Sequence, residues 1–175
     1  PTITVNSTAP NFAVGLAIGA VGYSQNIDQS TLWGGNTYLG AVLGQTGIFT
    51  GNLTPAASGY LLGASQGTIR IAKPLTGNFN AILGISMTGT SSRADQVVNN
   101  SGATIQFDTA MTYSGNTILN PGPLLRLSAK NALTGTGNVI LAGGQLRADP
   151  RRHHLVPPIP IGLPHQVDPA QIIRL

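Results

Sequence analysis

The residues that could carry acid–base chemistry are few in this chain of 175 residues. It contains no Cys and no Glu, so its side-chain carboxylates are five aspartates: Asp28, Asp95, Asp108, Asp149 and Asp168. Hydrolysis of a glycosidic bond typically needs two carboxylates that face each other across the substrate. Asp95 and Asp108 lie in one region of the chain, but no spacing places them on a common face, and Asp is frequent in surface turns. The sequence therefore predicts turn positions for both, and a protein that is not an enzyme.

The candidate metal ligands are three histidines: His153, His154 and His165. Adjacent histidines point in different directions on an extended chain, and no Cys, Glu or helical His pair supplements them. A serine-nucleophile motif is missing, and the glycine pairs do not open a predicted helix as a phosphate-binding loop would require. We therefore expect no metal site, no catalytic residues and no bound cofactor.

Charge is also scarce, which narrows the possible partners. Charged residues make up 8% of the chain, against roughly 25% in ordinary soluble domains. The formal net charge is +4, but nine basic residues over 175 are too thinly spread to predict a nucleic-acid partner. The apolar run at residues 12–22 is shorter than the roughly 20 residues of a membrane helix, so we expect no membrane span. We interpret this run as a pair of core strands packed on both faces.

The elements that must position any site repeat along the chain. Residues 112–147 overlay themselves after a shift of 22 residues, and residues 100–107 overlay 120–127 after a shift of 20. The pattern Asn-x-Ile-Leu occurs a third time at residues 80–83. A strand-rich repeat of about 20 to 30 residues without a helix signal indicates a solenoid, whose coils stack because no coil can bury its apolar face alone.

We therefore predict an all-β fold, a parallel β-helix over residues 1–147 with about 20 to 22 residues per coil. Gly122 and Gly144 should be equivalent corners that need a positive φ or a close approach. Trp33 should be a packed corner rather than part of a sugar-binding platform, and Thr88–Ala94 a surface loop. The predicted inward-facing residues are Ile105, Phe107, Ile118, Leu119, Leu124, Ile140, Leu141 and Leu146.

Several motifs in this region resemble a known family. Thr112-Tyr113-Ser114-Gly115, Asn120-x-Gly122-x-Leu124 and Gly137-Asn138-Val139-x-Leu141 are similar to the autotransporter-associated β-strand repeat of bacterial surface proteins. The resemblance covers about residues 60–147. It implies a right-handed parallel β-helix that is extracellular or on the bacterial cell surface, with a structural rather than catalytic role. The chain begins with Pro1 rather than Met, which we interpret as fitting a removed leader.

The composition changes at Ala148. Residues 148–175 hold six of the twelve Pro and all three His. Pro is excluded from sheet interiors but suits an extended conformation, and the segment is too apolar for ordinary disorder. We interpret it as an extended Pro-rich C-terminal arm that lies on an apolar surface, either of its own domain or of another copy of the chain. The residues expected to make that contact are Ile159, Ile161, Leu163, Val167, Ile172, Ile173 and Leu175.

These features leave two candidate functions. A β-helix ends in rows of unpaired N–H and C=O groups that pair with other chains unless they are covered. The first candidate is therefore a subunit of an extracellular or cell-surface fibre, whose partner is another copy of itself. The alternative is a bacterial surface adhesin or glycan-binding module whose partner is a surface glycan. The aromatic residues, one Trp, four Tyr and four Phe, are scattered along the chain, which favours the structural role.

Overall fold

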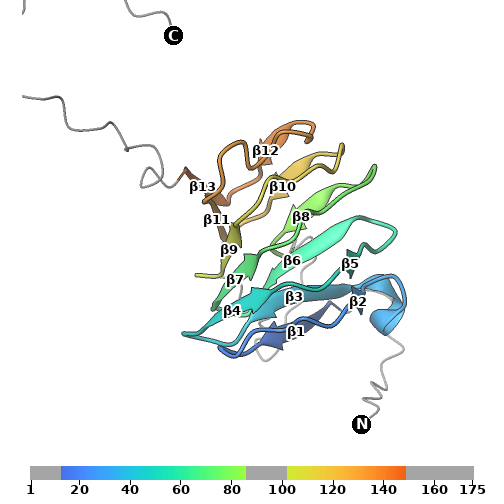
Figure 1. The fold of residues 1–175 in the computed structure, drawn as a ribbon, viewed down its shortest axis with the longest axis vertical. Coiled ribbons are helices and arrows are strands. Elements are labelled where there is room, and N and C mark those ends of the chain that lie inside the picture. The colour runs from blue at the N-terminus through green and yellow to red at the C-terminus, as the bar shows by residue number, and fades with distance from the viewer. Residues whose placement is uncertain (1–12, 86–101, 149–175) are drawn as a thin grey trace, which may run out of the picture.

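The computed structural model describes residues 13–85 and 102–148, which form two main parallel sheets and a small third one (Figure 1). Sheet A has six strands in the order β1 (Val14–Ile18), β3 (Thr37–Ala41), β6 (Tyr60–Ala64), β8 (Ala81–Leu83), β10 (Thr117–Leu119) and β12 (Val139–Leu141). Sheet B has five strands in the order β4 (Thr46–Phe49), β7 (Thr68–Ile71), β9 (Thr104–Phe107), β11 (Leu124–Leu127) and β13 (Gln145–Ala148). Sheet C pairs β2 (Ile27–Asp28) with β5 (Leu53–Thr54).

The chain passes from sheet A to sheet B and returns, one coil above the other, in a β-solenoid of about five turns. Every pair of named strands is parallel, so the predicted all-β parallel β-helix is confirmed. Its right-handed sense stays a prediction of the resemblance. The predicted C-terminal arm lies outside the described residues, apart from Ala148 at the end of β13.

The repeat predicted from the sequence is correct in sheet A and slips by one residue in the last step of sheet B. Thr117 pairs with Val139, a shift of 22. Leu124, however, pairs with Gln145 rather than with Leu146, a shift of 21. The step from β9 to β11 is 20 residues, as predicted. One step is much longer, because Thr68 pairs with Thr104 across 36 residues and the segment 86–101 falls between β8 and β9. The predicted loop Thr88–Ala94 belongs to that segment, outside the described residues.

The one-residue slip also corrects the corner assignment. The glycines that precede β9, β11 and β13 at equivalent corners are Gly102, Gly122 and Gly143, with φ of 87°, 109° and 116°. Gly143 rather than Gly144 is therefore the counterpart of Gly122. Gly144 is required for a different reason: a Cβ on it would lie 2.7 Å from the carbonyl oxygen of Asn120.

The core consists of columns of identical or similar side chains, because parallel in-register strands stack the same position of each coil. In sheet A, Leu39, Leu62, Leu83 and Leu119 are in register and completely buried. The inward residues of sheet B form two further columns against them. These are Ile69, Ile105 and Leu125, and Phe49, Ile71 and Phe107.

The predicted inward set was partly wrong. Ile105, Phe107 and Leu119 are buried as predicted. Ile118 lies between the buried Thr117 and Leu119 and faces outward, because successive side chains of a strand alternate between its two faces. Leu124 and Ile140 face outward for the same reason. Leu141 and Leu146 occupy inward positions but remain exposed at the end of the solenoid.

The N-terminal apolar run also differs from the prediction. Within the described part of this run, residues 13–22, only 14–18 form a strand, and this single strand β1 is the edge of sheet A. Its outward residues Gly15 and Ala17 are exposed, so the run is neither a strand pair nor packed on both faces. Trp33 lies in a short 3₁₀ turn, η1 (Leu32–Gly35), with φ of 44° and a half-buried side chain, which makes it a corner residue. No helix within residues 13–85 and 102–148 is long and apolar enough to cross a membrane.

Candidate functional site

The two aspartates that the structure describes lie on different sheets and are both engaged. Asp28 in β2 accepts hydrogen bonds from the Ser30 N–H at 2.9 Å and the Ser30 hydroxyl at 2.6 Å, which closes a turn. Asp108 directly follows β9, and its Oδ2 lies 2.7 Å from both Nε and Nη2 of Arg70. Sequence reasoning assigned Asp108 to a turn and missed this ion pair. Asp28 thus stabilises a turn, and Asp108 neutralises the charge of Arg70.

The other candidate catalytic and metal-binding residues lie outside the described part of the chain. They are Asp95, Asp149, Asp168, His153, His154 and His165. Among the residues that the structure describes, no group of three His, Cys, Asp or Glu side chains could hold a metal ion.

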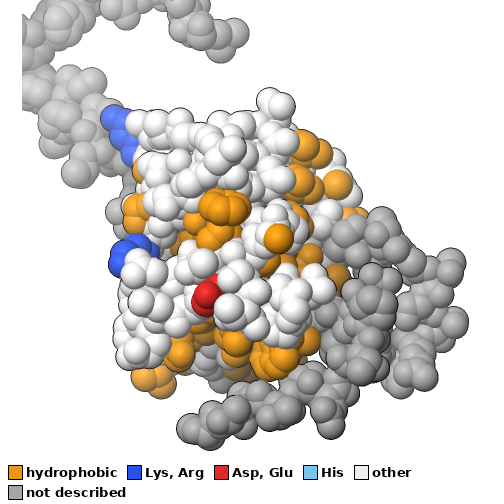
Figure 2. Space-filling view, turned by 90° about the vertical axis from the view of Figure 1, so that its right-hand side faces the viewer, with side chains coloured by type: hydrophobic (Ala, Val, Ile, Leu, Met, Phe, Trp, Pro, Cys, Tyr) orange, Lys and Arg blue, Asp and Glu red, His pale blue; other side chains and the backbone are white. Residues whose placement is uncertain are grey.

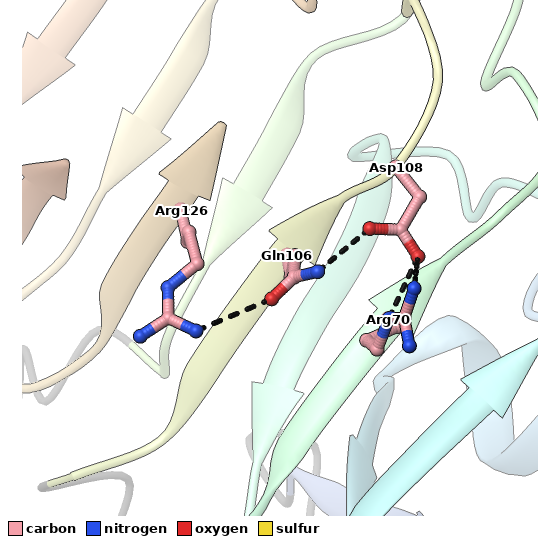
Figure 3. A network of polar contacts seen from close by, with 4 residues as sticks. All are labelled: Arg70, Gln106, Asp108 and Arg126. Carbon is pink, nitrogen blue, oxygen red and sulfur yellow. Dashed lines mark hydrogen bonds and ion pairs between the residues drawn. The ribbon is translucent and has the colours of Figure 1, made fainter. Parts of the chain in front are cut away.

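The Arg70–Asp108 pair belongs to a polar network on the outer face of sheet B (Figure 3). Gln106 donates from Nε2 to Oδ1 of Asp108 at 2.7 Å. Its Oε1 accepts a longer hydrogen bond, 3.4 Å, from Nη1 of Arg126. Arg70, Gln106 and Arg126 come from β7, β9 and β11, so the network crosses three successive coils. It joins these coils at their outer surface without contributing to the apolar core.

Burial shifts the acidity of two tyrosines. It raises the pKa of Tyr113 to about 12, against an opposing hydrogen bond of 2.6 Å between its hydroxyl and that of Thr117. Burial also raises the pKa of Tyr38 above its ordinary value. Both phenols are protonated at neutral pH, as an ordinary tyrosine is, and the raised pKa extends that state further into the alkaline range. Tyr113 therefore acts as a packed side chain whose hydroxyl is satisfied internally.

The most distinctive surface lies at the C-terminal end of the solenoid, in the last coil, which contains β12 and β13. Leu119 and Leu125 in the preceding coil are completely buried. Their in-register partners Leu141 and Leu146 are 58% and 42% exposed. The side chains are identical in type, so the difference arises because no further described coil covers the last one. The core of the solenoid is thus open at this end among the described residues.

A column of asparagines reaches the same open end. Asn80 precedes β8, and its Oδ1 accepts a hydrogen bond from the backbone N–H of Asn116 at 2.9 Å. Oδ1 of Asn116 in turn accepts from the N–H of Asn138 at 3.0 Å. Each side chain thereby satisfies the backbone of the next coil. Asn138 is the last member of this column among the described residues.

The opposite end of the solenoid is also an edge. β1 pairs only with β3 among the described strands, and its inward residues Val14 and Leu16 are half-buried. Val21, in the turn that follows, is fully exposed. The two ends therefore each present apolar side chains and an unpaired strand edge within the described residues. The predicted assembly residues of the arm, Ile159 to Leu175, lie outside this part of the chain.

Exposed aromatic rings are the feature that a glycan-binding platform would need. Tyr23 and Phe79 are 42% and 38% exposed. Tyr23 stacks on Phe49 with ring centroids 6.3 Å apart, and Phe79 packs edge-on against Tyr60 at 6.1 Å. Each is therefore the outer ring of a separate core pair. Figure 2 shows hydrophobic side chains as separate patches on a largely uncharged polar surface.

Comparisons of this chain with protein-family models, with curated proteins and with solved structures give no match. The open ends and the outer faces of the solenoid are its candidate functional surfaces among the described residues.

Proposed function

We propose that this protein is a non-catalytic structural subunit that assembles end to end into an extracellular or cell-surface filament. The observation that carries the proposal is the open core of the last coil. Leu141 and Leu146 continue columns that are completely buried one coil earlier, and both are largely exposed. An exposed apolar end with unpaired strand edges favours pairing with another chain.

The other end of the same molecule offers a matching surface. If β1 of a second copy continued sheet A beyond β12, Leu16 would follow Leu141 in the column of inward leucines. Both ends would be covered by the same contact, and Asn138 would be placed to accept a hydrogen bond from the backbone of the incoming coil, as Asn80 and Asn116 do within the solenoid. A contact between two different surfaces of identical subunits repeats indefinitely and produces an open filament.

The C-terminal arm has the supporting role in this proposal. Its apolar residues Ile159, Ile161, Leu163, Val167, Ile172, Ile173 and Leu175 would lie on the neighbouring copy while its prolines keep it extended. The extracellular or cell-surface location follows from the resemblance to bacterial surface proteins and belongs to the proposal.

The test is to place a charge at the open end. We expect Leu141→Arg to prevent the concentration-dependent assembly of the full chain, measured by analytical ultracentrifugation and electron microscopy. Ile82→Arg is the control, because Ile82 faces outward from β8, in the middle of sheet A and away from both ends. Ile82→Arg should assemble like the wild type.

Two results would contradict the filament. One is a wild-type chain that stays monomeric at high concentration, and the other is equal assembly of both arginine variants. A chain that ends at Ala148 tests the arm separately. It should fold normally but assemble poorly. If the wild type is monomeric and binds glycans, the adhesin is the better description.

A further inference from the structure

The outer face of sheet B carries a row of basic side chains that the filament proposal does not use. Outward positions of successive strands are in register, so residues 36 and 20 apart in the sequence become neighbours. The members of this basic row, from β7 to β13, are Arg70, Gln106, Arg126 and Arg147. The corresponding row on sheet A, Leu61, Ile82, Ile118 and Ile140, is entirely apolar.

Charge is concentrated on this side of the molecule. Within residues 13–85 and 102–148, the basic side chains are Arg70, Lys73, Arg126, Lys130 and Arg147. Each lies in a strand of sheet B or within three residues after one. Asp28 belongs to sheet C, so within the described residues Asp108 is the single carboxylate beside the row, and it pairs with Arg70.

Asp108 shows how the row binds an anion. Two nitrogens of Arg70 converge on one of its carboxylate oxygens at 2.7 Å, and Gln106 holds the other oxygen at 2.7 Å. The network is seen from the side in Figure 3, where the Arg126 guanidinium extends toward Gln106. The chain's own carboxylate thus occupies one of the anion positions along the row.

The next positions carry positive charge on adjacent strands. Arg126 and Arg147 are directly opposite each other in the parallel register, which corresponds to a strand separation of about 4.8 Å. Like charges placed directly opposite each other on a sheet destabilise it. An anion between the two guanidinium groups would remove that repulsion, and the planar fork of Arg favours carboxylate and sulfate oxygens.

We propose that the basic row of sheet B binds an acidic polysaccharide, with the polysaccharide lying along the solenoid axis. Arg126 and Arg147, on the neighbouring strands β11 and β13, are separated by about 4.8 Å, close to the length of one sugar unit, so carboxylate or sulfate groups on neighbouring sugars can each meet one guanidinium. A single row of side chains matches a single extended chain. The row has no aromatic side chain on which nucleic-acid bases could stack, which favours a polysaccharide over single-stranded nucleic acid.

The test compares binding of three probes to the full chain: heparin as a sulfated polysaccharide, polygalacturonate as a carboxylated one, and neutral dextran as the uncharged control. We expect salt-sensitive binding of heparin and polygalacturonate and none of dextran. The double variant Arg126→Gln/Arg147→Gln should weaken binding at least ~10-fold, because it removes charge-assisted hydrogen bonds. The double variant Arg126→Lys/Arg147→Lys keeps the positive charge, so its affinity for the two anionic polysaccharides should fall less.

The matched control is Lys73→Gln/Lys130→Gln, which removes the same charge from outside the row and should change affinity less than ~3-fold. Equal losses in the two glutamine variants would overturn the row as the site, leaving only a general charge effect. Unchanged binding of the arginine variant would do the same. Tighter binding of single-stranded or duplex DNA than of either polysaccharide at equal salt would overturn the ligand class. Melting temperatures of both variants, which we expect to be close to that of the wild type, show that each is folded.

Discussion

The last coil and the coil that precedes it share the Asn-x-Ile-Leu pattern and a Leu-Arg pair, yet they differ sharply in burial. In the preceding coil Leu119 and Leu125 are completely buried, whereas their partners Leu141 and Leu146 are exposed. The strand type, the register and the side chains are the same, so the difference comes only from what lies on the next level. In a solenoid, a residue's energetic role is set by the number of coils that cover it.

The largest expected effect is the difference in unfolding free energy between alanine variants of Leu119 and Leu141, which occupy the same inward column of sheet A. Leu119→Ala should lower the free energy of unfolding by about 2–5 kcal/mol, because it leaves a cavity in a closed core. Leu141→Ala removes the same atoms from an exposed position and should cost less than about 1 kcal/mol at monomer concentrations. Denaturant unfolding at low protein concentration measures both. Equal costs would mean that the last coil is covered as completely as the preceding one.

A pH titration tests how tightly the preceding coil is closed. Turns of the last coil run alongside residues 111–115, since the Met111 N–H donates to the Ala132 carbonyl and the Gly137 N–H to that of Gly115. The pKa of Tyr113 is raised to about 12 by burial, from an ordinary value of 10.0. Between these values the unfolded chain releases a proton that the folded chain retains, so stability falls as pH rises from about 10 to 12.

The expected loss from Tyr113 over this pH range is on the order of 2 kcal/mol. Thermal unfolding as a function of pH should show a constant contribution from Tyr113 below about pH 9 and the decline above it. Tyr113→Phe should flatten the decline, and phenolate absorbance should show one fewer late-titrating tyrosine. A decline of the same steepness in that variant would mean that Tyr113 is not the buried group responsible.

Gly144 leaves no room for a side chain against the preceding coil, which provides the third test. A Cβ there would lie 2.7 Å from the Asn120 carbonyl oxygen and 2.8 Å from Cβ of Leu119. Gly144→Val should therefore destabilise by at least about 1 kcal/mol, because it pushes the last coil away. Gly19→Ala is the control, since its added Cβ would meet only Oε1 of Gln45 at 3.6 Å. An unchanged melting temperature for the valine variant would contradict this close approach.

The smallest effect concerns the asparagine column. Asn116→Ala removes the acceptor for the Asn138 N–H and should cost about 1 kcal/mol. Asn138→Ala should be nearly neutral in the monomer, because its acceptor lies at the open end. In the assembled state the two costs in unfolding free energy should become more similar, since a second copy would then contact Asn138. Unfolding measured below and above the assembly concentration distinguishes the two situations.

The fold could be predicted from the sequence because equivalent positions of the sequence repeat lie on adjacent, paired strands. The shift that placed Ile118 on Ile140 and the copy at residues 80–83 correspond to real register pairs. The prediction of inward-facing residues was wrong where a shift of one residue exchanges the inner and outer faces of a strand. The slip at Leu124 moved the inward position to Leu125, because a change of one residue in a corner exchanges the two faces of the next strand.

The candidate sites were less accessible from the sequence. The assembly residues of the arm could be proposed from composition, and they remain a prediction outside the described residues. The ion pair of Arg70 with Asp108 links residues 38 apart. No local pattern marks it, although the outward position of Arg70 within Thr68–Ile71 was a usable signal once the register was known.

The sequence by itself determined that this chain forms stacked parallel strands, since alternating apolar residues and a repeat near 20 residues leave no other way to bury its small apolar faces. Only the tertiary structure decided which of the repeated residues are covered and which outer row is charged. Leu119 and Leu141 both end an Asn-x-Ile-Leu pattern, and their burial differs because a further coil covers only Leu119. Arg126 and Arg147 become neighbours only when the strands are in register, because charge adjacency across coils depends on loop length rather than on local pattern.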